Sequence, residues 1–274
     1  MLAAHRNQDD LTWSEDEIYP VPSEVIPEDV PAWWLMKKKN ALYYNASGKG
    51  DFARLIMASS LLTLEDSTKA REVDNHFADV VAFLNSLEAP TYPEAIDAEK
   101  VGRGEAIFDS NCAKCHGTYG MEESYPNLLV SLDQVQTDSL LIYGNFAFGD
   151  FENWYKDSWF SKEPNASNFT PERGYIAPPL DGIWATAPYL HNGSIPTLAD
   201  LLNSDQRPTY WKRSFNTSDI DYEKMGWNYT VESAGGNTDV YDTTIPGYHN
   251  VGHTFGDGLT DEQRSDLIEY LKTI

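Results

Sequence analysis

The chain has 274 residues and a formal net charge of −23, because 43 acidic residues outnumber 20 basic ones. A surface this negative repels nucleic acid and anionic membranes, so neither is expected as the main partner. The 41% of hydrophobic residues excludes a disordered chain. No apolar run reaches the roughly 20 residues of a transmembrane helix.

The first third of the chain is predicted to be an extended connector followed by helices. Residues 14–32 are rich in Pro and acidic residues, which favours an irregular surface segment. Prolines at 90 and 93 place a boundary between an N-terminal connector and helical segment, residues 1–93, and a second domain, residues 94–274. Helices are predicted, in chain order, at residues 51–62, 68–87, 97–111, 138–144, 197–202 and 260–273.

The only two cysteines of the chain form one compact motif with a histidine. Cys112, Cys115 and His116 match C-x-x-C-H, the attachment signature of c-type haem. Two thiols at this spacing can each bond one vinyl group of the porphyrin, and the histidine then lies under the iron as its proximal ligand. A zinc site would need further Cys or His ligands, and no thioredoxin-like context for a redox dithiol is evident. The motif therefore predicts one covalently bound haem c.

The segments flanking the motif predict a helix crossing. Asp97 can cap a helix that leads into Cys112, and Gly104 in its middle suggests close contact with another helix. Thr260 and Gln263 form a capping box at the start of an apolar terminal helix, the candidate partner. Residues 145–169 and 210–249 show no clear period and are expected to form long ordered loops, some with short hairpins, around the haem. The predicted fold class is mainly α, with a cytochrome c-like haem domain.

The residues leave several candidates for the second axial ligand of the iron. A methionine is usual in small cytochromes c, and a second histidine would lower the potential. His253 lies between glycines, which let the backbone approach a flat macrocycle, and it directly precedes the terminal helix. The candidates are Met1, Met36, Met57, Met121, Met225, His5, His76, His191, His249 and His253.

Three segments carry a resemblance to a known family. Residues 178–198 (PPLDGIWATAPYLHNGSIPTL) resemble the bacterial di-haem cytochrome c peroxidase superfamily, and within it the rubber-oxygenase-like di-haem cytochromes. Residues 33–41 (WWLMKKKNA) and 252–257 (GHTFGD) resemble the same branch. The similarity extends over nearly the whole chain and corresponds to the half of those proteins that carries the second haem.

The resemblance implies roles for individual residues. It implies that His116 and His253 are the axial ligands of the second, electron-transfer haem. Tyr189 and His191 form the Tyr-x-His motif of the family, whose histidine is expected near a haem propionate rather than on the iron. Backbone carbonyls at Thr186 and Pro188 would help to hold a calcium ion, which prefers hard oxygen ligands.

Trp33 and Trp34 have two interpretations. They are either a buried aromatic pair that fixes the connector, or a relay that shortens the electron path between two haems. Because they lie in the segment that resembles the family, both are candidates for binding the cofactor.

The resemblance also implies a function and a partner. Family members carry a first C-x-x-C-H, where peroxide or oxygen reacts, and this chain has none. We expect a one-haem electron-transfer cytochrome that acts as the second-haem part of a di-haem oxidoreductase. The alternative is a subunit or fragment of a peroxidase or rubber-type dioxygenase, or a free-standing mono-haem cytochrome. Catalysis by the chain alone is not expected, because a doubly ligated iron has no open site for oxygen.

The expected partner is a redox protein or a first-haem domain. Because haem c is attached outside the cytoplasm, the expected location is periplasmic or secreted, although no signal peptide is visible in this sequence.

Overall fold

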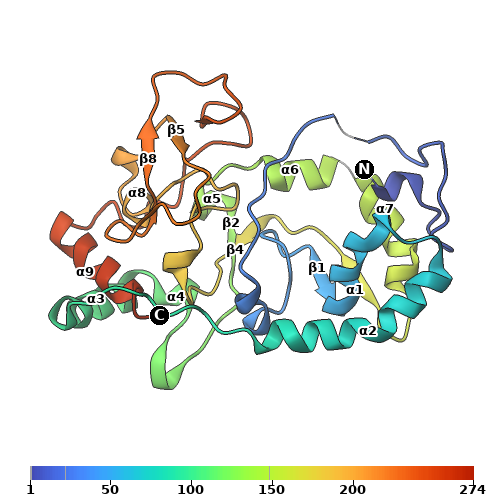
Figure 1. Cartoon of the computed structure of the whole chain (residues 1–274), viewed down its shortest axis with the longest axis horizontal. Helices are drawn as coiled ribbons and strands as arrows, with labels where there is room; N and C mark the ends of the chain where they lie inside the picture. The colour runs from blue at the N-terminus through green and yellow to red at the C-terminus, as the bar shows by residue number, and fades with distance from the viewer. Residues whose placement is uncertain (1, 22, 148) are drawn as a thin grey trace.

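The chain forms two groups of elements along its long axis, with a short strand pair between them (Figure 1). The computed structural model describes residues 2–21, 23–147 and 149–274. One group, at the right of Figure 1, combines the N-terminal helices with a segment from the middle of the chain. It contains η1 (Leu2–His5), β1 (Gly48–Gly50), α1 (Phe52–Met57), η3 (Ala58–Leu62), α2 (Ser67–Ser86), α7 (Gly149–Asp157), η5 (Trp159–Ser161) and β3 (Ser167–Phe169).

The other group, at the left of Figure 1, contains the helices around the C-x-x-C-H motif and the C-terminal part of the chain. Its helices are α3 (Ala98–Asn111), α4 (Ala113–His116), η6 (Ile183–Ala185), α8 (Leu198–Leu201), η7 (Ser204–Gln206) and α9 (Asp261–Leu271). Its strands are β5 (Tyr210–Arg213), β6 (Ile220–Asp221), β7 (Gly226–Trp227), β8 (Tyr229–Val231) and β9 (Tyr241–Asp242). The remaining elements are η2 (Trp33–Lys38), η4 (Gly120–Glu122), β2 (Leu129–Ser131), α5 (Leu132–Val135), α6 (Leu140–Ala147) and β4 (Gly174–Ile176).

All the strand pairs are short and antiparallel. β1 pairs with β3, β2 with β4 and β6 with β7, while β5 lies between β8 and β9 in a three-stranded sheet. The β1–β3 pair joins Gly48 to Phe169, and the β2–β4 pair joins Leu129 to Ile176. These pairs connect segments that lie far apart in the sequence.

The expectation of a mainly α fold is wrong. Helical residues, 3-10 turns included, make up 39% of the structure, and 12% of the residues are in strands or bridges. Residues 210–242, expected as long loops with short hairpins, form five short strands, for which aromatic residues such as Tyr210, Trp211 and Tyr229 are well suited. Strands of two to four residues are too short to produce a readable alternation in the sequence.

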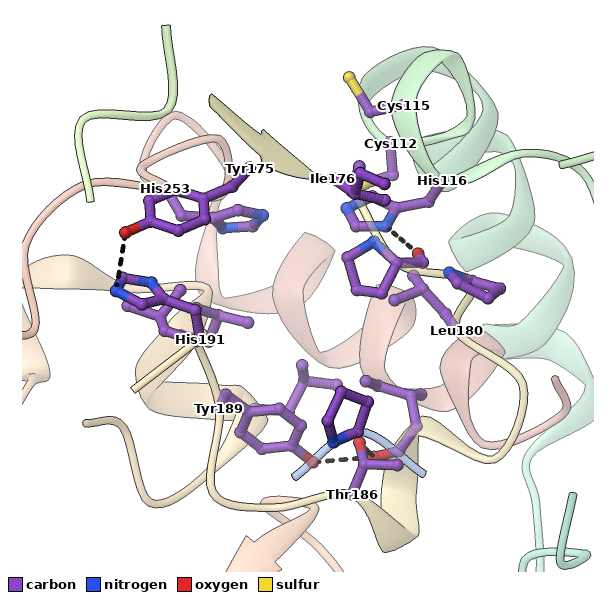
Figure 2. A pocket seen from close by; sticks show the side chains of 18 of the residues that line it. Cys112, Cys115, His116, Tyr175, Ile176, Leu180, Thr186, Tyr189, His191 and His253 are labelled. Carbon is purple, nitrogen blue, oxygen red and sulfur yellow. Dashed lines mark hydrogen bonds between the residues drawn. The ribbon is translucent and has the colours of Figure 1, made fainter. Parts of the chain in front are cut away.

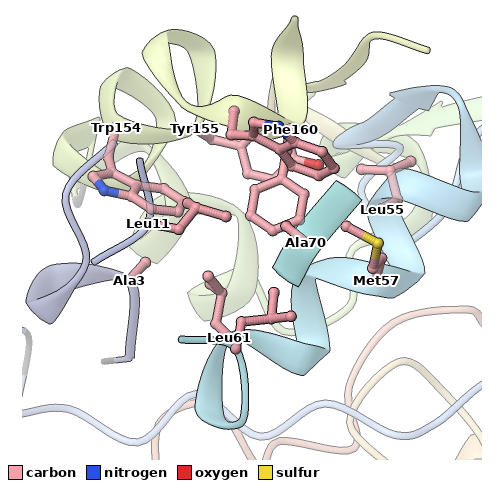
Figure 3. Close-up of a cluster of buried hydrophobic side chains, with 11 residues drawn as sticks. Ala3, Leu11, Leu55, Met57, Leu61, Ala70, Trp154, Tyr155 and Phe160 are labelled. Carbon is pink, nitrogen blue, oxygen red and sulfur yellow. The ribbon is translucent and has the colours of Figure 1, made fainter. Parts of the chain in front are cut away.

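The predicted helices are found with small shifts of their ends, but α7 was missed. It falls in residues 145–169, expected as loop, and it exists because Trp154 and Tyr155 bury their rings against the N-terminal helices. These rings join a hydrophobic cluster with Leu55, Met57 and Phe160 (Figure 3). No helix in the described part of the chain is both long and apolar enough to cross a bilayer.

The predicted crossing of the haem-motif helix and the terminal helix is present. Asp97 caps α3 by accepting from the backbone of Glu99 and Lys100, and a complete capping box begins α9. At Gly104 the two helices are so close that a Cβ would lie 2.0 Å from the carbonyl oxygen of Asp266. Beside this contact Arg103 donates two hydrogen bonds, of 2.7 and 2.8 Å, to the Asp266 carboxylate. The crossing fixes the end of α3, where the cysteines begin.

Candidate haem site

The C-x-x-C-H motif lies at the junction of two helices. Cys112 is both the C-cap of α3 and the N-cap of α4, and His116 is the last residue of α4. The backbone N–H groups of Cys115 and His116 both donate to the Cys112 carbonyl at 3.0 Å, which makes this turn tight. The His116 ring is oriented by its Nδ1, which lies 2.8 Å from the carbonyl oxygen of Pro178 (Figure 2). Its Nε2 therefore remains available to bind a metal ion.

A large cavity opens beside the motif. The space that no protein atom fills there, counted together with the solvent at its mouth, is about 1540 Å³. Its wall combines the three motif residues with mostly apolar side chains from α8, α9, β2 and β4. The apolar lining includes Phe108, Val130, Val135, Ile176, Leu180, Ile183, Leu198, Leu201, Leu202, Leu267 and Leu271. An apolar cavity of this kind suits the faces of a porphyrin.

His253 lies across the cavity from His116 (Figure 2). Its backbone has φ 47°, a left-handed conformation that non-glycine residues seldom adopt, and the preceding Gly252 has φ 74°. A Cβ at Gly252 would lie 2.2 Å from the carbonyl carbon of Gln136, so only glycine fits there. The His253 N–H donates to the Val135 carbonyl at 2.7 Å. This turn directs the imidazole into the cavity.

The distance between the two imidazoles fits a single iron between them. The ring centroids of His116 and His253 are 6.2 Å apart. Two metal–imidazole bonds of about 2.0 Å, with each ring nitrogen about 1.1 Å from its centroid, would place the two ring centroids about 6.2 Å apart. The Nδ1 atom of His253 is buried without a hydrogen-bond partner in the described part of the chain. The residues present therefore fit a haem with two histidine ligands.

Burial keeps both imidazoles neutral. It lowers the pKa of His116, and it lowers the pKa of His253 to about 4 with a smaller contribution from His116. The neutral form is the one that ligates a metal. Burial also raises the pKa of Cys112 to about 11, opposite to the lowered pKa of a redox-active thiol. These pKa directions favour the haem interpretation of the motif over a redox dithiol.

The other candidates for the second axial position lie elsewhere. In the described part of the chain no methionine lines the cavity. Met57 and Met225 are buried in two different hydrophobic clusters, and Met121 is fully exposed. Met1 lies outside the described residues. His249 pairs with Asp138, with Nδ1 2.5 Å from Oδ2, while His5 stacks on Trp13 and His76 is an exposed residue of α2.

His191 and Tyr189 also line the cavity, away from the His116–His253 axis (Figure 2). The His191 ring stacks on Tyr175 with centroids 4.2 Å apart, and its Nε2 is 3.1 Å from the Tyr175 hydroxyl. Burial lowers the pKa of His191 to about 4. The Tyr189 hydroxyl is buried and donates to the Met225 carbonyl at 2.9 Å.

Thr186 and Pro188 line the cavity as well. Within residues 2–21, 23–147 and 149–274, no group of three or more His, Cys, Asp or Glu side chains is arranged to hold a metal ion. A calcium site at these two residues stays a prediction that depends on their backbone oxygens.

The tryptophan pair does not contribute to the lining of the cavity. The Trp34 Nε1 donates to the Asp181 carbonyl at 2.8 Å, and Asp181 itself lines the cavity. Trp33 is 46% exposed. Trp34 is thus one hydrogen bond away from the cavity wall, while Trp33 faces solvent.

Sequence reasoning missed three residues that organise the site. Tyr175 holds His191, buried Asp138 accepts from the backbone N–H groups of Gly247 and residue 249, and Arg207 binds carbonyls of the loop before His253. A buried acid or arginine in a loop gives no periodic signal. None of the three belongs to a sequence motif, so the sequence carries no signal that would have identified them as part of the site.

This arrangement defines a cytochrome c-like site: a C-x-x-C-H turn at the end of a helix, crossed by a terminal helix, beside an apolar cavity. Residues 174–212 match the family model described as RoxA-like, cytochrome c-like. The match confirms, for this segment, the predicted resemblance to the rubber-oxygenase-like di-haem cytochromes. It supports a c-type cytochrome role with haem c as the cofactor.

Two proteins of Sinorhizobium fredii (strain NBRC 101917 / NGR234) are similar to the chain. The uncharacterized protein y4iM is 28% identical over 308 aligned residues, which cover 98% of this chain and 69% of that protein. The uncharacterized protein y4iJ is 42% identical over 111 residues, which cover 36% of this chain and 18% of that protein. The chain thus spans most of the first relative and less than a fifth of the second.

Proposed function

We propose that the chain is an electron-transfer cytochrome that binds one haem c, with His116 and His253 as its axial ligands. The observation that carries the proposal is the pair of imidazoles that line one apolar cavity with their ring centroids 6.2 Å apart. Cys112 and Cys115 would hold the haem covalently. The bound haem supplies one-electron redox chemistry through its iron.

The fixed positions of the two imidazoles suit electron exchange in which no bond is made or broken. Pro178 holds the His116 ring through Nδ1, and the Gly252–His253 turn fixes the second ring, so both imidazoles would hold a haem from fixed positions. Apolar residues of α8 and α9 line part of the cavity, so they would shield the haem from water on that side. If His116 and His253 both bind the iron, the haem would leave no free place for peroxide or oxygen, so chemistry on those molecules would belong to another centre.

We further propose that this chain serves as the second-haem part of a di-haem oxidoreductase. The similarity of residues 174–212 to the RoxA-like cytochromes supports this context. Its partner would be a first-haem domain or subunit, or another redox protein, and the location would be periplasmic or secreted.

The first test is the covalent attachment. Protein produced with haem-attachment enzymes should keep its haem through denaturation and acid–acetone extraction, and its intact mass should exceed that of the chain by one haem. Recovery of the haem in the organic phase would exclude thioether bonds to Cys112 and Cys115.

The second test is the ligand pair. The spectrum should be low-spin in both oxidation states and should lack the methionine–iron charge-transfer band. His253→Ala should open the ferrous iron to carbon monoxide, whereas the exposed control His76→Ala should leave the spectrum unchanged. If His191→Ala opens the iron and His253→Ala does not, the two histidines are assigned the wrong way round.

A further inference from the structure

Arg207 connects two segments beside the cavity through backbone carbonyls alone. Its guanidinium donates to the carbonyls of Asn250 and Gly252 at 2.7 Å each, and to that of His253 at 3.2 Å. It also donates to the carbonyl of Leu201 at 2.9 Å and to that of Asp200 at 3.3 Å. The rigid fork of the guanidinium can serve several acceptors at once.

The partners of Arg207 are unusual for a charged side chain. In the described part of the chain no carboxylate lies within ion-pair distance of the guanidinium, although 43 acidic residues are present in the sequence. Its donors are aimed at neutral carbonyls at a half-buried place, of which that of Asp200 also accepts from the Asn203 N–H. This geometry fixes two pieces of backbone relative to each other rather than neutralising a charge.

One of these pieces is held in a strained conformation. Gly252 and His253 both have positive φ, and sparsely populated conformations persist only where surrounding contacts over-determine them. On one side the His253 N–H is bound to the Val135 carbonyl. On the other side Arg207 binds the carbonyls before and after the turn, so the turn is clamped between α5 and the segment after α8.

We propose that Arg207 is the positioning residue that keeps the His253 imidazole on the axis to His116. The inference rests on the proposed function, because it assigns Arg207 a role in the ligation of the same iron. Without the guanidinium, the loop 250–253 can relax to ordinary backbone conformations that turn the imidazole out of the cavity. The ligand then dissociates more often, although the apolar wall of the cavity remains.

The experiment uses the full chain with its haem attached and compares Arg207→Gln and Arg207→Lys with the wild type. We expect Arg207→Gln to show a high-spin ferric fraction at neutral pH, at least tenfold faster carbon monoxide binding to ferrous iron, and a shifted reduction potential. Arg207→Lys keeps the charge but cannot reach both segments. Its high-spin fraction and carbon monoxide rate should therefore lie between those of the wild type and of Arg207→Gln. Added imidazole should restore the low-spin spectrum of Arg207→Gln, because it can occupy the place of a displaced His253.

Two matched variants separate positioning from stability. Arg264→Gln removes a neighbouring guanidinium that donates to the carbonyls of Leu202, Gly256 and Asp257 but to none in residues 250–253. Arg54→Gln removes a buried arginine from the other group of elements, where it pairs with Asp74. Both should lower the denaturation midpoint and leave the carbon monoxide rate within twofold of the wild type.

The outcomes distinguish this inference from the proposed function. A wild-type protein that is not low-spin contradicts the histidine pair itself, whatever the arginine variants do. A low-spin wild type with both Arg207 variants unchanged in spectrum and carbon monoxide rate overturns the role of Arg207 alone. An effect of Arg264→Gln equal to that of Arg207→Gln also overturns the role of Arg207. If Arg207→Gln fails to fold, the comparison of Arg207→Lys with the wild type is the test of that role.

Discussion

Gly104→Ala tests the helix crossing that positions the haem motif. The new Cβ would lie 2.0 Å from the Asp266 carbonyl oxygen and 2.8 Å from the Tyr270 Cβ. Ordinary contacts between carbon and oxygen are about 3.3 Å or longer, so α3 and α9 would have to separate by about 1 Å. Overpacking of this kind costs about 3 kcal/mol, and the better helix propensity of alanine offsets about 1 kcal/mol. We expect a net loss of about 2 kcal/mol in the free energy of unfolding.

The matched control is Gly102→Ala in the same helix. A Cβ there meets nothing within 4 Å, so this variant should gain about 1 kcal/mol from helix propensity alone. Urea unfolding followed by far-UV circular dichroism should separate the two variants by about 3 kcal/mol at an unchanged m value. A Gly104→Ala midpoint at or above that of the wild type would show that the helices do not cross at this residue.

Three further predictions concern buried polar groups and the tryptophans. The hydrogen bonds from Arg103 hold the pKa of Asp266 below its ordinary value. Asp266→Asn should therefore lower the free energy of unfolding by about 1 kcal/mol at pH 7. The urea midpoints of variant and wild type should converge as the pH falls below about 4, because the wild-type carboxylate then becomes protonated. Burial lowers the pKa of His191 to about 4. The imidazole is therefore protonated at a higher pH in the unfolded chain than in the folded one. Part of the wild-type free energy of unfolding should be lost as the pH falls from about 6.5 towards 4. A plot of unfolding free energy against pH should be flatter in that range for His191→Asn; equal slopes would contradict a buried neutral imidazole. Trp34→Phe should lose about 1 kcal/mol with its hydrogen bond to a backbone carbonyl, and Trp33→Phe almost nothing. Slower electron transfer to a partner haem at unchanged stability would instead identify either tryptophan as a relay.

Some of the site was accessible from sequence because its signals are local. Cys112, Cys115 and His116 lie within five consecutive residues, and their spacing alone predicts haem attachment. The crossing of α3 and α9 was also predictable, since Gly104 in a helix pattern and the capping box at Thr260 are both visible in short windows.

Other parts of the fold depend on contacts between distant segments. The β1–β3 and β2–β4 pairs join residues more than forty positions apart, and each strand has only three residues. The ring of Tyr155, which makes α7 part of the N-terminal cluster, has partners near residues 55 and 70. Arg207 acts on carbonyls that no side-chain pattern encodes. In each case the tertiary partner decides the structure, and the local sequence does not.

The position of the two imidazoles has a consequence for how the protein matures. His116 and His253 are 137 positions apart in the chain (253 less 116), and iron bound by both would close that stretch into a ring. In the chain-entropy model, closing a loop of more than a hundred residues removes about 5 kcal/mol of freedom from the unfolded ensemble. The haem would thus act as a reversible cross-link between the middle of the chain and its last helix. A chain released before haem attachment would lack that restraint, so proteases should cut the loop 249–258 far faster in the haem-free chain than in the loaded protein.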